Sequence, residues 1–141
     1  MQTLKNVFVP SECEHMITDE QIECGKKEVS YSLREDPVHE HHDCVRIAYA
    51  WFDAQTKLGN STKRTPSLKH KIEKWAGRYV STADVELAAH LHPEIHGTYP
   101  RFNISTRLTL PSDSRLNGIS EAFTQEYRCR FDASIYSAHE Q

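Results

Sequence analysis

Apolar residues recur at helical spacing through the middle of the chain. Between residues 37 and 58 they cover most of a helix circumference, which is typical of a helix buried on nearly all sides. A narrower apolar stripe follows in residues 66–77. The next stripe, in residues 82–92, begins after Ser81, a residue type that favours helix starts, and stops before Pro93. We therefore expect three central helices over 37–58, 66–77 and 82–92.

Two shorter helices are expected nearer the ends of the chain. Thr18 and Gln21 have the spacing of a capping box, and Gly25 is typical of a helix end, so the first is predicted over residues 19–24. Apolar residues at helical spacing predict the second within residues 112–123.

Alternation of apolar and polar residues predicts β-strands between and around these helices. It is clearest in residues 101–110 and recurs near 28–34 and 126–136, and a short apolar run near 5–9 suggests a further strand. The chain is therefore predicted to be an α+β protein, a single domain over 1–141. Its three central helices would pack on a small, mainly antiparallel sheet.

Charge is distributed unevenly along the chain, although the net charge is only −3. Residues 1–44 hold ten acidic and four basic side chains, whereas residues 45–110 hold five acidic and ten basic ones. Such segregation indicates a charged partner, or acidic and basic faces that pair with each other.

The positive charges gather on the predicted helix 66–77, just before it, and on the predicted strand 101–110. Cations along one flank of a helix can meet successive phosphates of a nucleic acid, and the release of counterions drives such binding. Alternation also gives the strand an exposed face of polar donors, suited to reading polar groups. The candidate nucleic-acid-binding residues are Lys63, Arg64, Lys71, Lys74, Arg78, Arg101 and Arg107 for phosphates, and Asn103 and Ser105 for polar readout.

The order of these elements, helices followed by a strand, resembles that of a winged helix–turn–helix over residues 37–110. The resemblance implies a DNA-binding regulatory protein without catalytic activity. However, the helix that would read bases holds Asp84 and Glu86 and neither Lys nor Arg, and the isoelectric point of about 6.3 is low for such a domain. We therefore expect phosphate contacts from the second helix and the strand.

Two groups of histidines are alternative candidates for chemistry. Residues 39–44 and residues 90–96 both contain His at spacings that could share a metal ion, which would suit a metal-dependent hydrolase. No H-E-x-x-H pattern is present, because Asp43 stands where its second His would be. A surface pair of His39 with Asp43 and a packed His92 are the simpler interpretation, so no metal or other cofactor is predicted.

A protein partner is the alternative to nucleic acid. The acidic first 44 residues could meet a basic partner, as in an inhibitor or adaptor with opposed acidic and basic surfaces. No apolar run approaches the roughly 18 residues of a membrane span, and the N-terminus lacks an apolar signal core. The sequence thus predicts a cytoplasmic chain that binds nucleic acid, DNA in particular, or one protein, and no membrane. A homodimer is compatible with either partner.

Glycine and proline in residues 96–100 predict a turn before the predicted strand 101–110. Tyr99 lies within that turn. Its ring could stack on a base or pack against the edge of the sheet, and the pattern favours packing.

Overall fold

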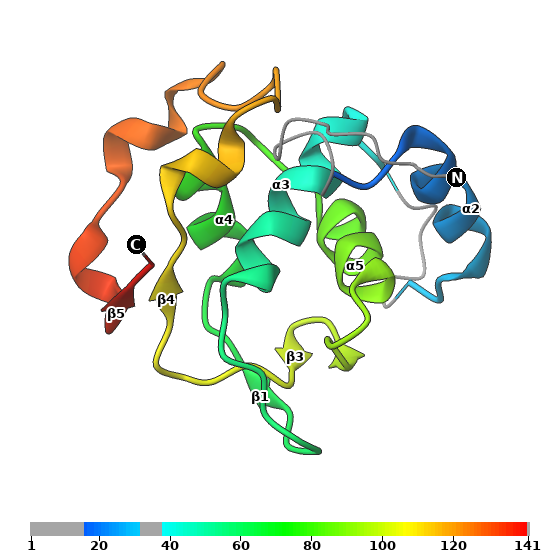
Figure 1. Ribbon diagram of the computed structural model, residues 1–141, viewed down its shortest axis with the longest axis horizontal. Coiled ribbons are helices and arrows are strands. Elements are labelled where there is room, and N and C mark those ends of the chain that lie inside the picture. Colours follow the sequence, from blue (N-terminus) through cyan, green and yellow to red (C-terminus); the bar gives the residue numbers. More distant parts are fainter. Residues whose placement is uncertain (1–15, 32–37, 141) are drawn as a thin grey trace, which may run out of the picture.

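The structure is a computed structural model that describes residues 16–31 and 38–140. These residues form a mixed fold of four α-helices and a small, three-stranded antiparallel sheet (Figure 1). The helices are α2 (Asp19–Glu28), α3 (His42–Asp53), α4 (Leu68–Ala76) and α5 (Thr82–Leu91). The strands are β1 (Lys63–Arg64), β2 (Gly97–Thr98), β3 (Arg101–Phe102), β4 (Thr109–Leu110) and β5 (Ala138–His139). Three short 3₁₀ helices are η1 (Asp113–Leu116), η2 (Glu126–Arg130) and η3 (Ala133–Ile135).

The central position predicted for the first long helix is confirmed by α3. Figure 1 shows it between α4 and α5, and its Trp51 and Phe52 are fully buried. The helix is shorter than the predicted 37–58, because residues 38–41 and 54–58 are not helical. Beyond its end, the Gln55 amide donates to the carbonyl oxygen of Thr109 at 2.8 Å and accepts that residue's N–H at 3.0 Å. The chain after α3 is thus held by hydrogen bonds between the Gln55 side chain and the β4 backbone, in place of further helical turns.

The start of α2 is predicted correctly, but its end is not. Thr18 and Gln21 form the expected capping box. The helix then continues through Gly25 to Glu28, because Gly25 lies where α2 packs on α5. A Cβ atom at Gly25 would be 2.9 Å from a methyl group of Leu87, so the glycine allows close packing and does not end the helix.

The predicted helices 66–77 and 82–92 are confirmed as α4 and α5, with small changes in their bounds. The start of α5 is a capping box, in which the Ser81 hydroxyl accepts the Asp84 N–H and the Asp84 carboxylate accepts the Ser81 N–H. The chain leaves α4 at Gly77, whose φ of 64° lies in the left-handed region that glycine favours.

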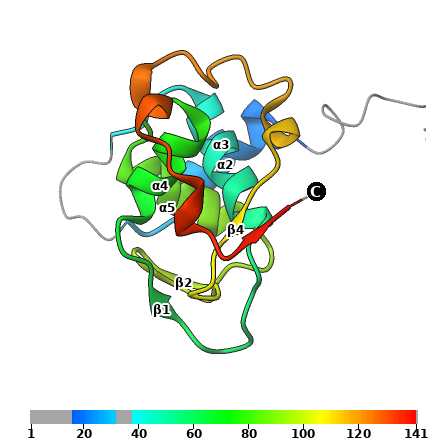
Figure 2. The same cartoon turned by 90° about the vertical axis from the view of Figure 1, so that its left-hand side faces the viewer.

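The sheet is smaller than the sequence predicts, and its strands β1 and β2 lie below the helices in Figure 2. Its strand order is β1-β3-β2, with antiparallel pairing throughout, and β4 and β5 form a separate parallel pair. Only the two ends of the predicted strand 101–110 are strands, as β3 and β4. In the predicted strand 28–34, Glu28 belongs to α2 and residues 29–31 are irregular, whereas residues 32–34 lie outside the described residues, as does the predicted strand 5–9.

The prediction of a strand over 126–136 is wrong, because η2 and η3 occupy this segment. Its residues are held by side chains: η2 packs on α4, and the Arg128 guanidinium group donates to the Trp75 carbonyl oxygen and lies 4.2 Å from the centre of the Phe131 ring. The predicted helix in 112–123 is only the 3₁₀ turn η1. None of the helices in the described ranges combines the length and the apolar character needed to cross a membrane.

Candidate nucleic-acid interface

Strand pairing brings two of the predicted site residues, Arg64 and Arg101, side by side. Arg64 of β1 lies directly opposite Arg101 of β3, and Thr98 of β2 lies opposite Arg101 on its other side. Directly paired residues point to the same face of a sheet, with Cβ atoms about 5 Å apart. The other face carries Phe102, which is 2% exposed, so the two arginines face away from the core. We call Arg64 and Arg101 the arginine pair.

No neighbouring acid neutralises the arginine pair within the described part of the chain. There, no Asp or Glu oxygen lies within 4.0 Å of the charged nitrogens of Lys63, Arg64 or Arg101. Like charges directly opposite each other destabilise a sheet. An anion bound to this face would relieve that repulsion.

Arginines that hold the fold together are, by contrast, paired with carboxylates. The shortest nitrogen–oxygen distances in these pairs run from 2.5 to 3.3 Å, and most pairs join segments far apart in sequence. The pairs include Arg46–Asp43, Arg78–Glu121, Arg115–Glu140 and Arg128–Asp113. The arginine pair on the sheet therefore has a different environment from that of the structural arginines.

The remaining predicted cations lie near the sheet and along α4. Lys63 is exposed in β1, and Arg107 is exposed between β3 and β4. On α4, the Lys71 ammonium group donates to the carbonyl oxygen of Pro66. Burial lowers the pKa of Lys71, and the positive charge of Lys74 lowers it further, so these two side chains are neighbours. They form a second basic group on the helix that follows β1.

Arg78 is buried and serves the fold. It is 7% exposed, and its guanidinium group donates to Glu121 Oε1 at 2.9 Å and to the Tyr79 carbonyl oxygen at 2.8 Å. The prediction of an exposed cation here is wrong. Because α4 ends at Ala76, the helical spacing that aligned Arg78 with the lysines no longer applies.

Asn103 is also a structural residue. It is 1% exposed, its amide group donates to the carbonyl oxygens of Leu58 and Glu94 at 3.0 Å each, and it accepts the His96 N–H at 2.6 Å. Because the amide is already engaged and buried, the prediction that Asn103 reads polar groups is wrong. The Ser105 hydroxyl accepts a backbone N–H at 3.1 Å, and its readout role stays a prediction.

The histidine groups pair with carboxylates. His39 Nδ1 lies 2.9 Å from Asp84 Oδ1, and His39 Nε2 lies 2.7 Å from the Tyr31 hydroxyl. The expected partner Asp43 is therefore replaced by Asp84, which the start of α5 brings close. His92 is 3% exposed, as expected for a packed histidine. Across residues 16–31 and 38–140, no three His, Cys, Asp or Glu side chains are grouped so that they could hold a metal ion.

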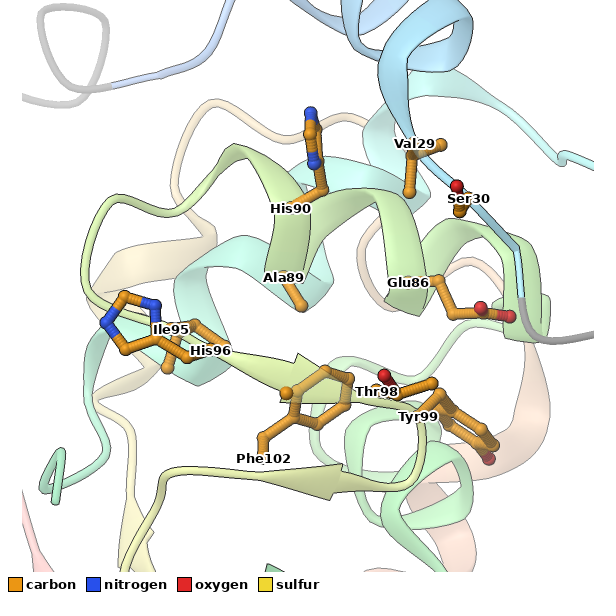
Figure 3. Close-up of a pocket in the computed structure, with 11 residues that line it drawn as sticks. Val29, Ser30, Glu86, Ala89, His90, Ile95, His96, Thr98, Tyr99 and Phe102 are labelled. Carbon is orange, nitrogen blue, oxygen red and sulfur yellow. The ribbon is translucent and has the colours of Figure 1, made fainter. Parts of the chain in front are cut away.

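An open pocket of about 380 Å³ lies between α5, the β2–β3 hairpin and the chain that leaves α2 (Figure 3). From α5 comes Glu86, which is 6% exposed, and from the hairpin come Tyr99 and Phe102. Thr98 also lines the pocket and stands opposite Arg101 in the register. The predicted turn in residues 96–100 is confirmed by this hairpin, in which the Tyr99 ring packs partly against Phe102.

The sequence did not predict this pocket, and Glu86 served there only as an argument against base reading by its helix. A usable signal is present, because Glu86 lies between Val85 and Leu87, and Ala88 and Ala89 follow. An isolated acid in such an apolar run predicts a partly buried carboxyl group.

Comparisons of the chain with protein-family models, with curated protein sequences and with solved structures find no match. The geometry and charge of the arginine pair and its surroundings are therefore the basis for a functional proposal. A nucleic-acid partner and a protein partner both stay open at this point.

Proposed function

We propose that the protein is a small, non-catalytic nucleic-acid-associated protein, DNA-binding and regulatory, that contacts phosphates through the arginine pair. The observation that carries the proposal is the position of Arg64 opposite Arg101 on an exposed face, with no carboxylate of the described residues beside them. A guanidinium group binds a phosphate through two parallel hydrogen bonds. Because each nucleotide of a strand carries a phosphate, the pair can contact one phosphate or two successive ones.

The order of the elements supports a winged-helix-like arrangement. β1 lies between α3 and α4, the β2–β3 hairpin follows α5, and β3 pairs with both other strands. In a winged helix–turn–helix, the hairpin after the helix pair is the wing, and here that hairpin carries Arg101. Residues 83–89 of α5 are all buried, so base reading by this helix is not part of the proposal. The proposal is limited to phosphate contacts from the sheet. Electrostatic attraction to the phosphates is increased by further cations, Lys63, Lys71, Lys74 and Arg107.

The test is a salt titration of binding to a fluorescent duplex and to a fluorescent single strand, followed by anisotropy. Wild type is compared with the Arg64→Gln/Arg101→Gln double variant. Loss of two phosphate contacts should lower the slope of log affinity against log salt concentration by about 1.8 on the duplex, at about 0.9 per contact. An unchanged slope together with an unchanged affinity would overturn the proposal.

Arg130→Gln is the matched control. Arg130 is exposed in η2, and no Asp or Glu in the described ranges lies within 4.0 Å of its guanidinium group. It lies outside the sheet, so its replacement should leave affinity and slope unchanged. A loss as large as that of one sheet arginine would mean that net charge, not this surface, drives binding.

A protein partner is the second candidate, and the separation of charges favours it. The acidic helix α2, with Glu20 and Glu28 exposed, lies at the upper right of Figure 1, whereas β1 lies at the bottom. An inhibitor or adaptor with opposed acidic and basic surfaces would retain neither duplex nor single strand. The same double variant would then weaken its complex with one acidic protein, measured by pull-down.

A further inference from the structure

The arginine pair occupies the kind of register position at which facing residues of a sheet come closest. The Thr65 N–H donates to the Pro100 carbonyl oxygen at 3.2 Å, and these two residues lie next to Arg64 and Arg101 in their strands. In an antiparallel ladder, such a bond flanks a pair that exchanges no backbone hydrogen bonds of its own. Cα atoms in this kind of pair are about 4.5 Å apart, compared with about 5.5 Å in a hydrogen-bonded pair. Two arginines carried so close together on one face can contact a single phosphate.

The face that carries the arginine pair is open and has no aromatic ring in the same row. Figure 1 shows β1 and β3 at the lower end of the molecule, below the helices, and both arginines are exposed. The row across the three strands consists of Arg64, Arg101 and Thr98. Proteins that hold the bases of a single strand stack them on aromatic side chains. This row therefore suits a phosphate and not a base.

The charge of the arginine pair matches a phosphate monoester better than a diester. A diester within a strand carries one negative charge, whereas a monoester carries about −1.5 to −2 at pH 7. Like charges directly opposite each other destabilise a sheet, and the two arginines bring two positive charges together. A monoester compensates nearly all of this charge, whereas one diester leaves about one positive charge uncompensated.

The number of free oxygens points to the same ligand. A guanidinium group binds a phosphate through two parallel hydrogen bonds to two different oxygens. A diester has only two oxygens outside its ester links, so two guanidinium groups would compete for both of them. A monoester has three such oxygens. The two guanidinium groups can then share one oxygen while each keeps a second oxygen of its own.

We propose that the arginine pair binds the terminal phosphate monoester of a nucleic-acid strand in preference to the diesters within the strand. This inference rests on the proposed function, because it names the phosphate that the same two residues contact. A phosphorylated peptide carries the same chemical group. The exposed cations Lys63 and Arg107 near the sheet favour a strand, because each further nucleotide brings another negative charge.

The test compares labelled oligothymidines of equal length that end in a 5′-phosphate, in a 3′-phosphate or in hydroxyl groups only, followed by anisotropy at low salt. The additional charge-assisted contact should favour at least one phosphorylated strand about tenfold over the hydroxyl-ended strand. Methylation of the preferred phosphate turns it into a diester at the same place and should reduce the preference to about threefold or less. Arg64→Gln and Arg101→Gln should each reduce it to about twofold or less.

Lys63→Gln is the matched control for these variants. Lys63 precedes Arg64 in β1 and is exposed, but it stands opposite Phe102 and therefore on the other face of the sheet. Its replacement removes the same charge from the same strand and should preserve the preference. The comparison of strand ends on the wild-type protein requires no variant, so it does not depend on how a variant folds. A preference that survives in the Arg64→Gln/Arg101→Gln double variant, or that Lys63→Gln also abolishes, would overturn the inference.

The outcomes separate this inference from the proposed function. Equal binding of all strands, with a salt slope that falls in the double variant, overturns the inference and leaves the phosphate-binding proposal standing. Absence of binding to every strand overturns both. Binding of a phosphoserine peptide in that case would favour the protein partner.

Discussion

The left-handed backbone at Gly97 gives a direct test of the sheet that carries the arginine pair. Gly97 has a φ of 118°, and a Cβ atom added there would lie 2.1 Å from the carbonyl oxygen of Arg101. Such an approach is too close for any side chain, and the oxygen belongs to the paired backbone of β3, so β2 or β3 must move. Strained backbone and overpacking each contribute at least about 1 kcal/mol, which sets a floor of about 2 kcal/mol for Gly97→Ala.

The assay is equilibrium unfolding in urea, followed by the fluorescence of the buried Trp51 and Trp75. Gly59→Ala is the matched control, because Gly59 is exposed in the loop before β1 and nothing lies within 4 Å of its added Cβ atom. That change should be neutral or stabilise by up to about 1 kcal/mol, through the unfolded chain. If Gly97→Ala and Gly59→Ala agreed within about 0.5 kcal/mol, the close approach of β2 and β3 would be refuted.

Two further predictions concern the core around α3. Asp43→Ala should lower the free energy of unfolding by about 2 kcal/mol, because it removes one of the two carboxylates paired with Arg46 and the acceptor of the Ser120 hydroxyl. The exposed Asp132→Ala should change it by less than about 1 kcal/mol in the same urea assay. Burial alone would raise the pKa of Asp43, but hydrogen bonds from Arg46 and other donors hold it below the ordinary 3.8. Its stabilisation is therefore present above about pH 4 and lost as the pH falls further, and Asp43→Asn should flatten this acid loss. An equally steep loss in that variant would contradict this assignment. Burial raises the pKa of the Cys44 thiol to about 12, so iodoacetamide at pH 8 should modify the exposed Cys129 and leave Cys44 unmodified until urea unfolds the chain, as mapped by mass spectrometry. Modification of Cys44 in the folded protein would refute its burial.

Helix starts and the central helix could be predicted from sequence because they depend on local chemistry. The hydroxyls of Thr18 and Ser81 bond to backbone N–H groups only three residues away, so the capping boxes are visible in the sequence itself. Apolar residues around most of the circumference of α3 likewise indicate that other elements of the fold surround this helix.

Strands and helix ends were less predictable because they depend on partners far away in the chain. Alternation in 126–136 predicted a strand, but no strand of the described residues pairs with it, and η2 packs on α4 instead. Gly25 looked like a helix end until the approach of Leu87 gave it a different role. Arg78 was placed on a basic flank that ends when Gly77 turns the chain.

In the candidate site too, some features follow from the sequence and others depend on the tertiary structure. Sequence by itself determined that Arg64 is a cation just before a predicted helix, that Arg101 begins a predicted strand, and that residues 96–100 turn. Tertiary structure decided that the two arginines share one face, because only the antiparallel register of β1 and β3 sets them opposite each other. It also decided that Glu86 lines a pocket, because packing of α5 against the hairpin buries a charge that composition would place at the surface. Both features depend on contacts between residues far apart in the sequence. The apolar residues around Glu86 indicate burial of this side chain, but they do not reveal the pocket.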